Sequence, residues 1–291
     1  MLPSNPNWHP TTFLRFERGY ATSMDTARII TDAGAAFIKA MGNRQGPHPL
    51  ACELVGTQLA RWLGLPTFDF DLLTIDAETD EIPLSRGRFA ESGPAFVTKA
   101  VNGHSWSGSD DELKQLLNPE DITRLVVLDT WTRNADRHPP NPNTRRPNLD
   151  NVFLEEIPKI DSGKSVDLRL IAMDHSHCFT SGSELDKTLA FIDKVRDEQT
   201  YGLFPEFRPY VTVSAVQASL DRLSEFSAAE AATIIQMVPN EWEVDLQART
   251  AWAEFLCQRA AYLVDSLMDR LAKDCWPGQL FDKRFVNGGE P

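Results

Sequence analysis

The sequence predicts an α+β protein of two parts, a small β-rich part followed by a larger, mainly helical part. Residues 13–101 hold short apolar or alternating runs of strand type around one helical segment. Residues 183–291 carry apolar side chains at helical spacing over most of their length. A polar, glycine-containing crossing, residues 102–109, separates them. We therefore place the boundary after residue 103, which gives the ranges 1–103 and 104–291.

Residues 13–16 and 26–30 are the first two predicted strands. The connection between them contains Gly19, Thr22 and Ser23. A turn of small residues between strands can bring backbone N–H groups and hydroxyls close to phosphates. A single glycine between strands is also typical of an ordinary hairpin, so the turn by itself does not decide between the two.

Lys39 lies inside the next predicted strand, residues 35–40. A lysine in an apolar strand either faces solvent or finds an anionic partner. Residues 50–63 have helical spacing, and Gly64-Leu65-Pro66 ends that helix. We expect Glu53 in the first turn of the helix, where it either complements the helix dipole or pairs with Lys39.

Two more strands complete the β-rich part, an edge strand over residues 68–75 and another over 95–101. In the second part, Asn118 as N-cap and Pro119 as first helical residue predict a helix to about residue 133. Ser227 predicts a further cap, with Glu230 completing a capping box. The candidate helices of the C-terminal half are 184–195, 213–226, 228–237 and 246–272, and we expect residues 283–291 to be frayed.

Composition limits the class of protein. The formal net charge of −13 argues against a broad nucleic-acid footprint. No apolar run is long enough to span a bilayer, and the N-terminus, MLPSNPNWHP, lacks the features of a signal peptide. We therefore expect a cytoplasmic protein without a membrane span. The four cysteines are scattered, which favours buried free thiols over zinc ligands or disulfides. The oligomeric state is not predicted.

The stretch 125–179 contains the candidate chemistry. Asp136 follows an apolar run, Asn151 enters a short strand-type run, and Asp174 comes directly after a second such run, residues 168–173. This layout presents an acid on a loop, an amide at a strand start and an acid at a strand end. Such groups can hold a divalent cation and a hydroxyl nucleophile beside a triphosphate. Acids and amides in turns also serve only to bond the local backbone.

This stretch resembles the catalytic core of HipA-like kinases, and more distantly that of type II phosphoinositide kinases. The residues that carry the resemblance are Asn134-Ala135-Asp136-Arg137-His138, then Asn141 or Asn151, then Met173-Asp174-His175. The likeness extends over about residues 13–180. It implies a bilobal protein-kinase-like fold, in which the β-rich part is an N-lobe that covers the nucleotide and the helical part is the C-lobe.

The resemblance also implies roles in binding ATP. Lys39 would hold the α- and β-phosphates with Glu53 as its partner, and the turn with Gly19, Thr22 and Ser23 would lie near the phosphates. Lys99 and Val101 would belong to a hinge that contacts adenine through backbone groups.

In the C-lobe, the resemblance makes Asp136 the group that orients the attacking hydroxyl and gives His138 a supporting role. Arg137 either contacts phosphate or braces the loop. Asp174 would bind Mg²⁺ together with an amide. That amide is Asn141 by its distance from Asp136 or Asn151 by its place at a strand start; we favour Asn151 and retain Asn141. The pair Arg145-Arg146 either binds an acidic substrate surface or, as we favour, is solvated loop charge.

The implied activity is transfer of the γ-phosphate of Mg-ATP to a hydroxyl. A serine or threonine of a protein is the first choice of acceptor, and a lipid or small-molecule alcohol is the second. The alternative is a catalytically silent kinase-like module that regulates a partner. The presence of Lys39, Asp136 and Asp174 together counts against that alternative.

Overall fold

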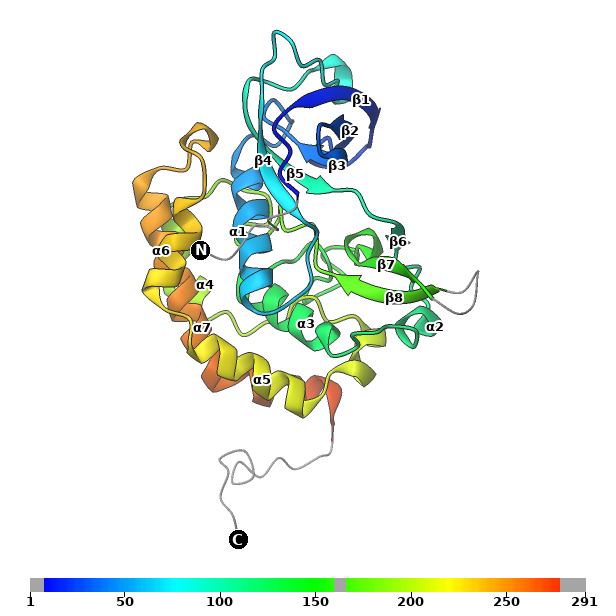
Figure 1. The fold of residues 1–291 in the computed structure, drawn as a ribbon. Helices are drawn as coiled ribbons and strands as arrows, with labels where there is room; N and C mark the ends of the chain where they lie inside the picture. Colours follow the sequence, from blue (N-terminus) through cyan, green and yellow to red (C-terminus); the bar gives the residue numbers. More distant parts are fainter. Residues whose placement is uncertain (1–7, 160–165, 278–291) are drawn as a thin grey trace.

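A computed structural model describes residues 8–159 and 166–277 of the chain (Figure 1). Its N-terminal part is a five-stranded antiparallel sheet in the order β1-β2-β3-β5-β4. The strands are β1 (Phe13–Gly19), β2 (Ala27–Thr31), β3 (Gly34–Lys39), β4 (Phe70–Ile75) and β5 (Gly93–Lys99). The predicted strands are confirmed, and β4 lies at the edge of the sheet as expected.

Helix α1 (His48–Trp62) connects β3 to β4 and lies at the centre of the molecule (Figure 1). Every residue from 49 to 60 is buried. The helix begins two residues before the predicted start, with a proline in its first turn, where a proline costs no backbone hydrogen bond. Glu53 therefore lies beyond the first turn, which contains no acidic residue, so the expected position of Glu53 near the helix start is wrong.

The second part opens with a three-stranded antiparallel sheet in the order β6-β7-β8. Its strands are β6 (Gly103–Ser105), β7 (Phe153–Pro158) and β8 (Val166–Ile171), and the helices near it are α2 (Asp110–Leu113) and α3 (Asp121–Thr132). The N-cap predicted at Asn118 is wrong. The Asn118 side chain instead accepts from the Leu170 N–H (2.9 Å) and donates to the Leu170 carbonyl (3.1 Å). This ties Asn118 to β8, and α3 begins only at Asp121.

The C-terminal half is helical, as predicted. Its elements are η3 (Lys187–Ala190), α4 (Ile192–Val195), η4 (Pro205–Tyr210), α5 (Val213–Ser224), α6 (Ala228–Gln236), η5 (Asn240–Trp242) and α7 (Leu246–Cys275), and two further short 3₁₀ turns are η1 (Ser85–Gly87) and η2 (Leu149–Asn151). The predicted helix 184–195 is wrong, because Phe191 is extended (φ −66°, ψ 141°) and separates η3 from α4. The capping box of Ser227 and Glu230 is confirmed. The tail expected to fray, residues 283–291, lies outside the described residues.

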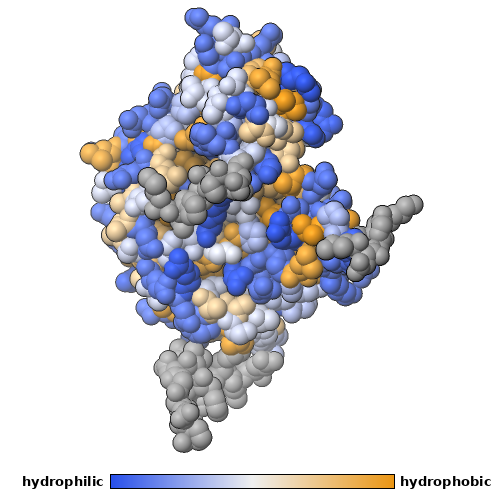
Figure 2. Space-filling model, viewed as in Figure 1, coloured by the Kyte–Doolittle hydropathy of each residue, from blue (hydrophilic) through white to orange (hydrophobic). Residues whose placement is uncertain are grey.

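Two hydrophobic clusters organise the interior. The smaller lies against the five-stranded sheet and includes Ile29, Ile38 and Val97. The larger contains α1 together with the second part of the chain. The outline narrows on the right of Figure 2, between the part with the five-stranded sheet and the part with β6–β8, and hydrophobic colour is broken into separate patches on this face. The lobe boundary at residue 103 remains a prediction, but the core assigns α1 to the second part.

All four cysteines are free; Cys52 and Cys178 are buried, and Cys257 and Cys275 are half-buried. Across the helices of the described ranges, none has the length and apolar character needed to cross a bilayer.

Candidate active site

Lys39 joins two acidic side chains from distant parts of the chain. Its Nζ donates to Glu53 Oε2 on α1 (2.7 Å) and to Asp174 Oδ1 after β8 (3.1 Å). The side chains of Lys39 and Glu53 are 14% and 5% exposed, and that of Asp174 is 24% exposed. Of the two roles predicted for Glu53, the structure therefore shows pairing with Lys39. Asp174 is the most solvent-exposed of the three side chains.

Electrostatic attraction keeps the Lys39 ammonium and the Asp174 carboxylate charged in spite of their burial. Burial alone would lower the pKa of Lys39, but the negative charges of Asp174 and Glu53 outweigh burial and raise it. Burial alone would raise the pKa of Asp174, but the Lys39 ammonium and the Ser176 hydroxyl reverse this and hold the Asp174 pKa well below its usual range. Burial raises the pKa of Glu53 in spite of Lys39. Asp174 is thus held as a carboxylate, the form that binds a cation.

The backbone after β8 is shaped to meet α1. Asp174 is in the left-handed region (φ 55°), which bends the chain sharply and is open to aspartate at modest cost. The next N–H, that of His175, then donates to Glu53 Oε2 (3.1 Å). The buried His175 side chain lies directly against Gly56 of α1, where an added Cβ would come within 2.3 Å of the His175 Cβ. Burial lowers the pKa of His175 to about 3, so its ring is neutral.

The loop after α3 is braced by a buried ion pair. The Arg137 Nε donates to Asp129 Oδ2 (2.7 Å), and both side chains are fully buried. Arg137 also donates to the Met173 carbonyl (2.8 Å), directly before Asp174. Asn134 donates to the other oxygen of Asp129 (3.1 Å). Arg137 therefore braces the loop and ties it to the Asp174 segment, which decides between its two predicted roles.

Asp136 is held between three side chains. Its Oδ2 accepts from Asn151 Nδ2 (2.7 Å) and lies 3.5 Å from His177 Nδ1. Its Oδ1 forms an ion pair with Arg145. The Asp136 side chain is 12% exposed, so little of it is open to solvent beside these partners.

Asp136 and Asp174 belong to one connected group. The Ser176 hydroxyl donates to Asp174 Oδ1 (2.9 Å) and lies 3.3 Å from His177 Nδ1, and His177 contacts Asp136. Lys39, Asp136 and Asp174, which come from β3, the α3–η2 loop and the segment after β8, are therefore gathered at one place. The structure therefore brings together the three charged side chains that the sequence motifs place in one site.

The two candidate amides occupy different environments. Asn151 is buried, contacts Asp136 and accepts from Asn148 Nδ2 (3.1 Å). Asn141 is exposed, and its side chain accepts from the Asn143 N–H in the same loop (3.0 Å). The geometry favours Asn151, the residue that we had preferred.

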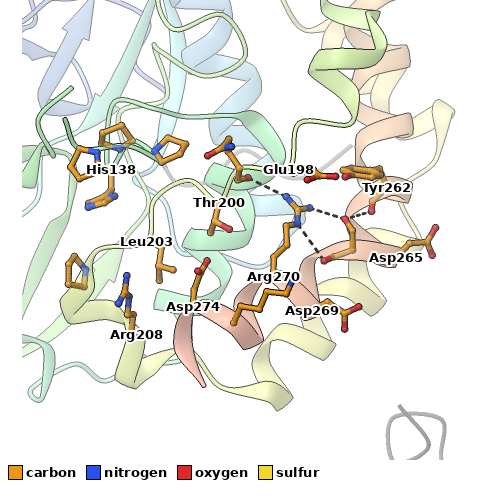
Figure 3. A pocket seen from close by; sticks show the side chains of 17 residues that line it. His138, Glu198, Thr200, Leu203, Arg208, Tyr262, Asp265, Asp269, Arg270 and Asp274 are labelled. Atoms are coloured by element: carbon orange, nitrogen blue, oxygen red, sulfur yellow. Dashed lines mark hydrogen bonds between the residues drawn. The ribbon is translucent and has the colours of Figure 1, made fainter. Parts of the chain in front are cut away.

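His138 points away from this group. Its ring lies against Phe204 (4.8 Å between centroids) and lines a cavity of about 690 Å³, which Figure 3 shows together with Arg270 of α7. The half-buried ring has a lowered pKa because burial disfavours its charged form. The ring hydrogen-bonds the Pro139 backbone of the same loop, and no contact between the ring and Asp136 occurs among the described residues. The supporting role of His138 remains a prediction. The His138 carbonyl also has a bracing contact, accepting from the Gly202 N–H (2.9 Å).

The turn with Gly19, Thr22 and Ser23 lies at the end of the sheet that carries Lys39. It directly precedes the start of β2, which pairs with the end of β3 that carries Lys39. The Thr22 hydroxyl accepts a backbone N–H of its own turn (2.9 Å), and Arg44 donates to the carbonyls of Thr22 and Ser23 (3.0 and 3.3 Å). Contact of this turn with phosphates remains a prediction.

Lys99 and Val101 lie further from Lys39. The β5 residue paired with Lys39 is Phe96, and Lys99 is three residues beyond it. The Lys99 ammonium is 3.5 Å from the Asp69 carboxylate and 44% exposed, and Val101 is half-buried between β5 and β6. The structure does not bring the Lys99 side chain to the Lys39 group. A hinge role for either residue through its backbone remains a prediction.

Sequence reasoning missed three side chains of the group: Arg145, Ser176 and His177. We had favoured Arg145 as solvated loop charge, which its ion pair with Asp136 contradicts. The signal for Ser176 and His177 was their place directly after Asp174, where short polar side chains can turn back to a carboxylate. The signal for Arg145 was a cation in the chain between the two candidate acids, Asp136 and Asp174.

The donor set fits Mg²⁺ bound together with phosphates. No group of three or more His, Cys, Asp or Glu side chains within residues 8–159 and 166–277 could hold a metal ion alone. Mg²⁺ usually needs only one or two carboxylates plus phosphate oxygens and water. Lys39 and Ser176 both use Oδ1 of Asp174, and Oδ2 forms no hydrogen bond to any residue that the structure describes. Asp174 Oδ2 and Asn151 Oδ1 are oxygen donors of the kind that Mg²⁺ prefers.

The fold is similar to that of two solved structures. The crystal structure of the Helicobacter pylori proinflammatory kinase CtkA is similar with a TM-score of 0.57 and 13% identity, over 91% of this chain and 99% of that chain. The structure of hydra Fam20 with sugar is similar with a TM-score of 0.50 and 12% identity, over 93% of this chain and 88% of that chain. Identities this low concern the fold alone, and they confirm a bilobal kinase-like fold. No curated protein matches the chain.

The family follows from a sequence comparison. A family model described as HipA-like kinase matches residues 30–274, most of the chain. The protein therefore belongs to the HipA-like kinase family, and the resemblance inferred from its motifs is confirmed.

Proposed function

We propose that this protein transfers the γ-phosphate of Mg-ATP to a hydroxyl group, with a serine or threonine of a protein as the acceptor. The observation that carries the proposal is the convergence of Lys39, Asp136 and Asp174. Phosphoryl transfer depends mainly on positioning and charge neutralisation, and this group supplies a cation, an orienting acid and a metal-binding acid.

Each side chain has a defined task in this proposal. Lys39, held in place by Glu53, would contact the phosphates of ATP. Asp174 and Asn151 would hold Mg²⁺, which when bound neutralises charge on the phosphates. Asp136 would accept the hydrogen bond of the acceptor hydroxyl and take its proton as the new oxygen–phosphorus bond forms. The bond from the γ-phosphorus to the bridging oxygen breaks, and ADP leaves.

The oxygen of Asp136 that would meet the acceptor is Oδ1. Oδ2 is held from the interior by Asn151, which is buried, and His177 is close to it. Oδ1 is paired only with Arg145, a partly exposed side chain on a surface loop, among the contacts of the described residues. An acceptor arriving from solvent can replace Arg145 more easily than a buried amide.

The test is transfer of labelled phosphate from ATP, by the wild-type protein and by Asp136→Asn, to the protein itself and to dephosphorylated casein. We expect the variant to lose at least about a hundredfold in rate, because a positioned base contributes that much or more. Thermal stabilisation by ATP with Mg²⁺ should persist in the variant, since Asp136 has no task in holding the nucleotide.

A matched control is Asp150→Asn, which changes an exposed acid one residue before Asn151. We expect it to keep wild-type rates. Stabilisation of the wild type by Mg-ATP without any transfer would instead indicate a catalytically silent nucleotide-binding module. Equal rates for wild type and Asp136→Asn would rule out the role given to Asp136.

A further inference from the structure

Arg145 occupies the one side of Asp136 that the proposed reaction needs. It forms an ion pair with Asp136 Oδ1, and its side chain is 37% exposed while that of Asp136 is 12% exposed. The neighbouring Arg146 is exposed and makes no ion pair with any acid of the described residues. One arginine of the pair is therefore directed into the site, and the other is not.

The loop that carries Arg145 is anchored to the site. The Asn148 N–H donates to the Arg137 carbonyl (2.9 Å), and the Asn148 side chain donates to Asn151 Oδ1 (3.1 Å). At its other end, the Thr144 N–H and hydroxyl both donate to the Asn141 carbonyl (3.1 and 2.7 Å). Arg145 thus lies between two bonded turns, which hold its backbone in place and leave its partly exposed side chain free to change partner.

An acceptor hydroxyl that bonds to Asp136 Oδ1 must displace Arg145 from that oxygen. The guanidinium then loses its anion beside a site that contains a cation of its own, Lys39. An acceptor with a carboxylate next to its hydroxyl would supply a replacement anion, and the charge-assisted hydrogen bonds of Arg145 would be kept. A neutral acceptor would leave the Arg145 guanidinium without an anionic partner. The same contact would offset repulsion of an acidic acceptor by Asp136 and Asp174.

We propose that Arg145 selects acidic acceptors: a serine or threonine flanked by aspartate or glutamate in a protein. Arg145 exchanges its bond with Asp136 Oδ1 for one with the acidic side chain of the acceptor, and the acceptor hydroxyl takes its place on Oδ1. This proposal rests on the proposed function and names the substrate class of the same site.

The experiment uses two peptides that differ only beside a single serine, with aspartate on both sides in one and asparagine in the other. Binding of the fluorescently labelled peptides is measured by anisotropy, and transfer from ATP is measured as kcat/KM, for wild type, Arg145→Ala and Arg146→Ala. For wild type and Arg146→Ala we expect a preference of about tenfold or more for the aspartate peptide, the size of one charge-assisted hydrogen bond. For Arg145→Ala the two peptides should become nearly equal, with the KM for ATP unchanged.

Two results would overturn the inference while leaving the kinase activity intact. They are a wild type that does not distinguish the peptides and a preference that survives Arg145→Ala. In the second case, a raised KM for ATP in Arg145→Ala would assign Arg145 to the phosphates of ATP. A wild type that transfers phosphate to no acceptor, itself included, would instead overturn the proposed function and this inference together.

Discussion

At the scale of single residues, the ion pair of Asp129 and Arg137 organises the site without taking part in it. Both side chains are fully buried, and Arg137 reaches the carbonyl directly before Asp174. Gly202 packs so closely on Asp129 that an added Cβ would lie 2.3 Å from its Oδ2. A buried charge without its partner is far more costly than a buried pair, so each residue depends on the other.

We expect Arg137→Ala to lower the free energy of unfolding by about 3–5 kcal/mol, because Asp129 would remain buried without its cation. Urea unfolding followed by circular dichroism measures this change. Arg196→Ala removes an exposed arginine and is the matched control, with an expected change within about 0.5 kcal/mol. A loss for Arg137→Ala as small as that of the control would show that the pair does not support the fold.

At the scale of elements, the contact of α1 with the segment after β8 sets the position of Glu53. Glu53 Oε2 bonds both Lys39 and the His175 N–H, and three residues later Gly56 allows the His175 side chain to lie directly on the helix. The absence of a side chain at Gly56 is what permits this close approach. The helix, β3 and the Asp174 segment therefore meet at one point.

Gly56→Ala should be destabilising by about 1–3 kcal/mol, since its Cβ would overlap the His175 Cβ and overpack the interface. The same change within an unobstructed helix stabilises by about 0.5–1 kcal/mol, so the sign of the effect is decisive. Thermal unfolding measures the stability. Stabilisation by Mg-ATP should also fall, because α1 would shift and carry Glu53 away from Lys39. A variant more stable than wild type would contradict the close packing.

At the scale of the whole molecule, α1 belongs to the core of the C-terminal helices although it lies between strands in the sequence. The Trp62 indole donates to Glu230 of α6 (2.6 Å), and Arg222 of α5 donates to the Trp62 carbonyl (3.1 Å). The Trp62 ring also packs on those of Trp131 and Phe226. The five-stranded sheet has a separate, smaller cluster of buried side chains. The helix that presents Glu53 is thus held by the larger part of the protein.

Hydrogen exchange should reveal this arrangement. We expect the amides of α1 to exchange at rates like those of α3 and α7, and at least about tenfold more slowly than those of β1, an edge strand whose side chains are mostly exposed. Peptide-resolved mass spectrometry measures the rates, and each strand of the sheet acts as an internal reference. Exchange of α1 in step with β1 and β2 would show instead that α1 opens with the sheet.

Local patterns predicted most of the elements because they depend on near neighbours in the chain. Short apolar or alternating runs identified the strands, and Ser227 with Glu230 identified the start of α6. The prediction was wrong where a distant partner intervened: Asn118 bonds the backbone of β8 instead of capping α3. Phe191 interrupts a run that has helical spacing in the sequence. The residues next to Asn118 and Phe191 in the sequence do not indicate either of these differences from the prediction.

The sequence by itself determined the α+β class and most of the elements, since these follow from local residue patterns. It also identified Lys39, Asp136 and Asp174 as candidate residues, through residue type and the resemblance to a known family. Only the tertiary structure decided that Glu53 pairs with Lys39 and that Asn151 is the amide beside Asp136. It also decided that the His138 ring packs on Phe204 and that Arg145 pairs with Asp136. The reason is physical: a side chain's charge and hydrogen-bonding capacity are fixed by its type, but its partner is set by which distant segments pack together.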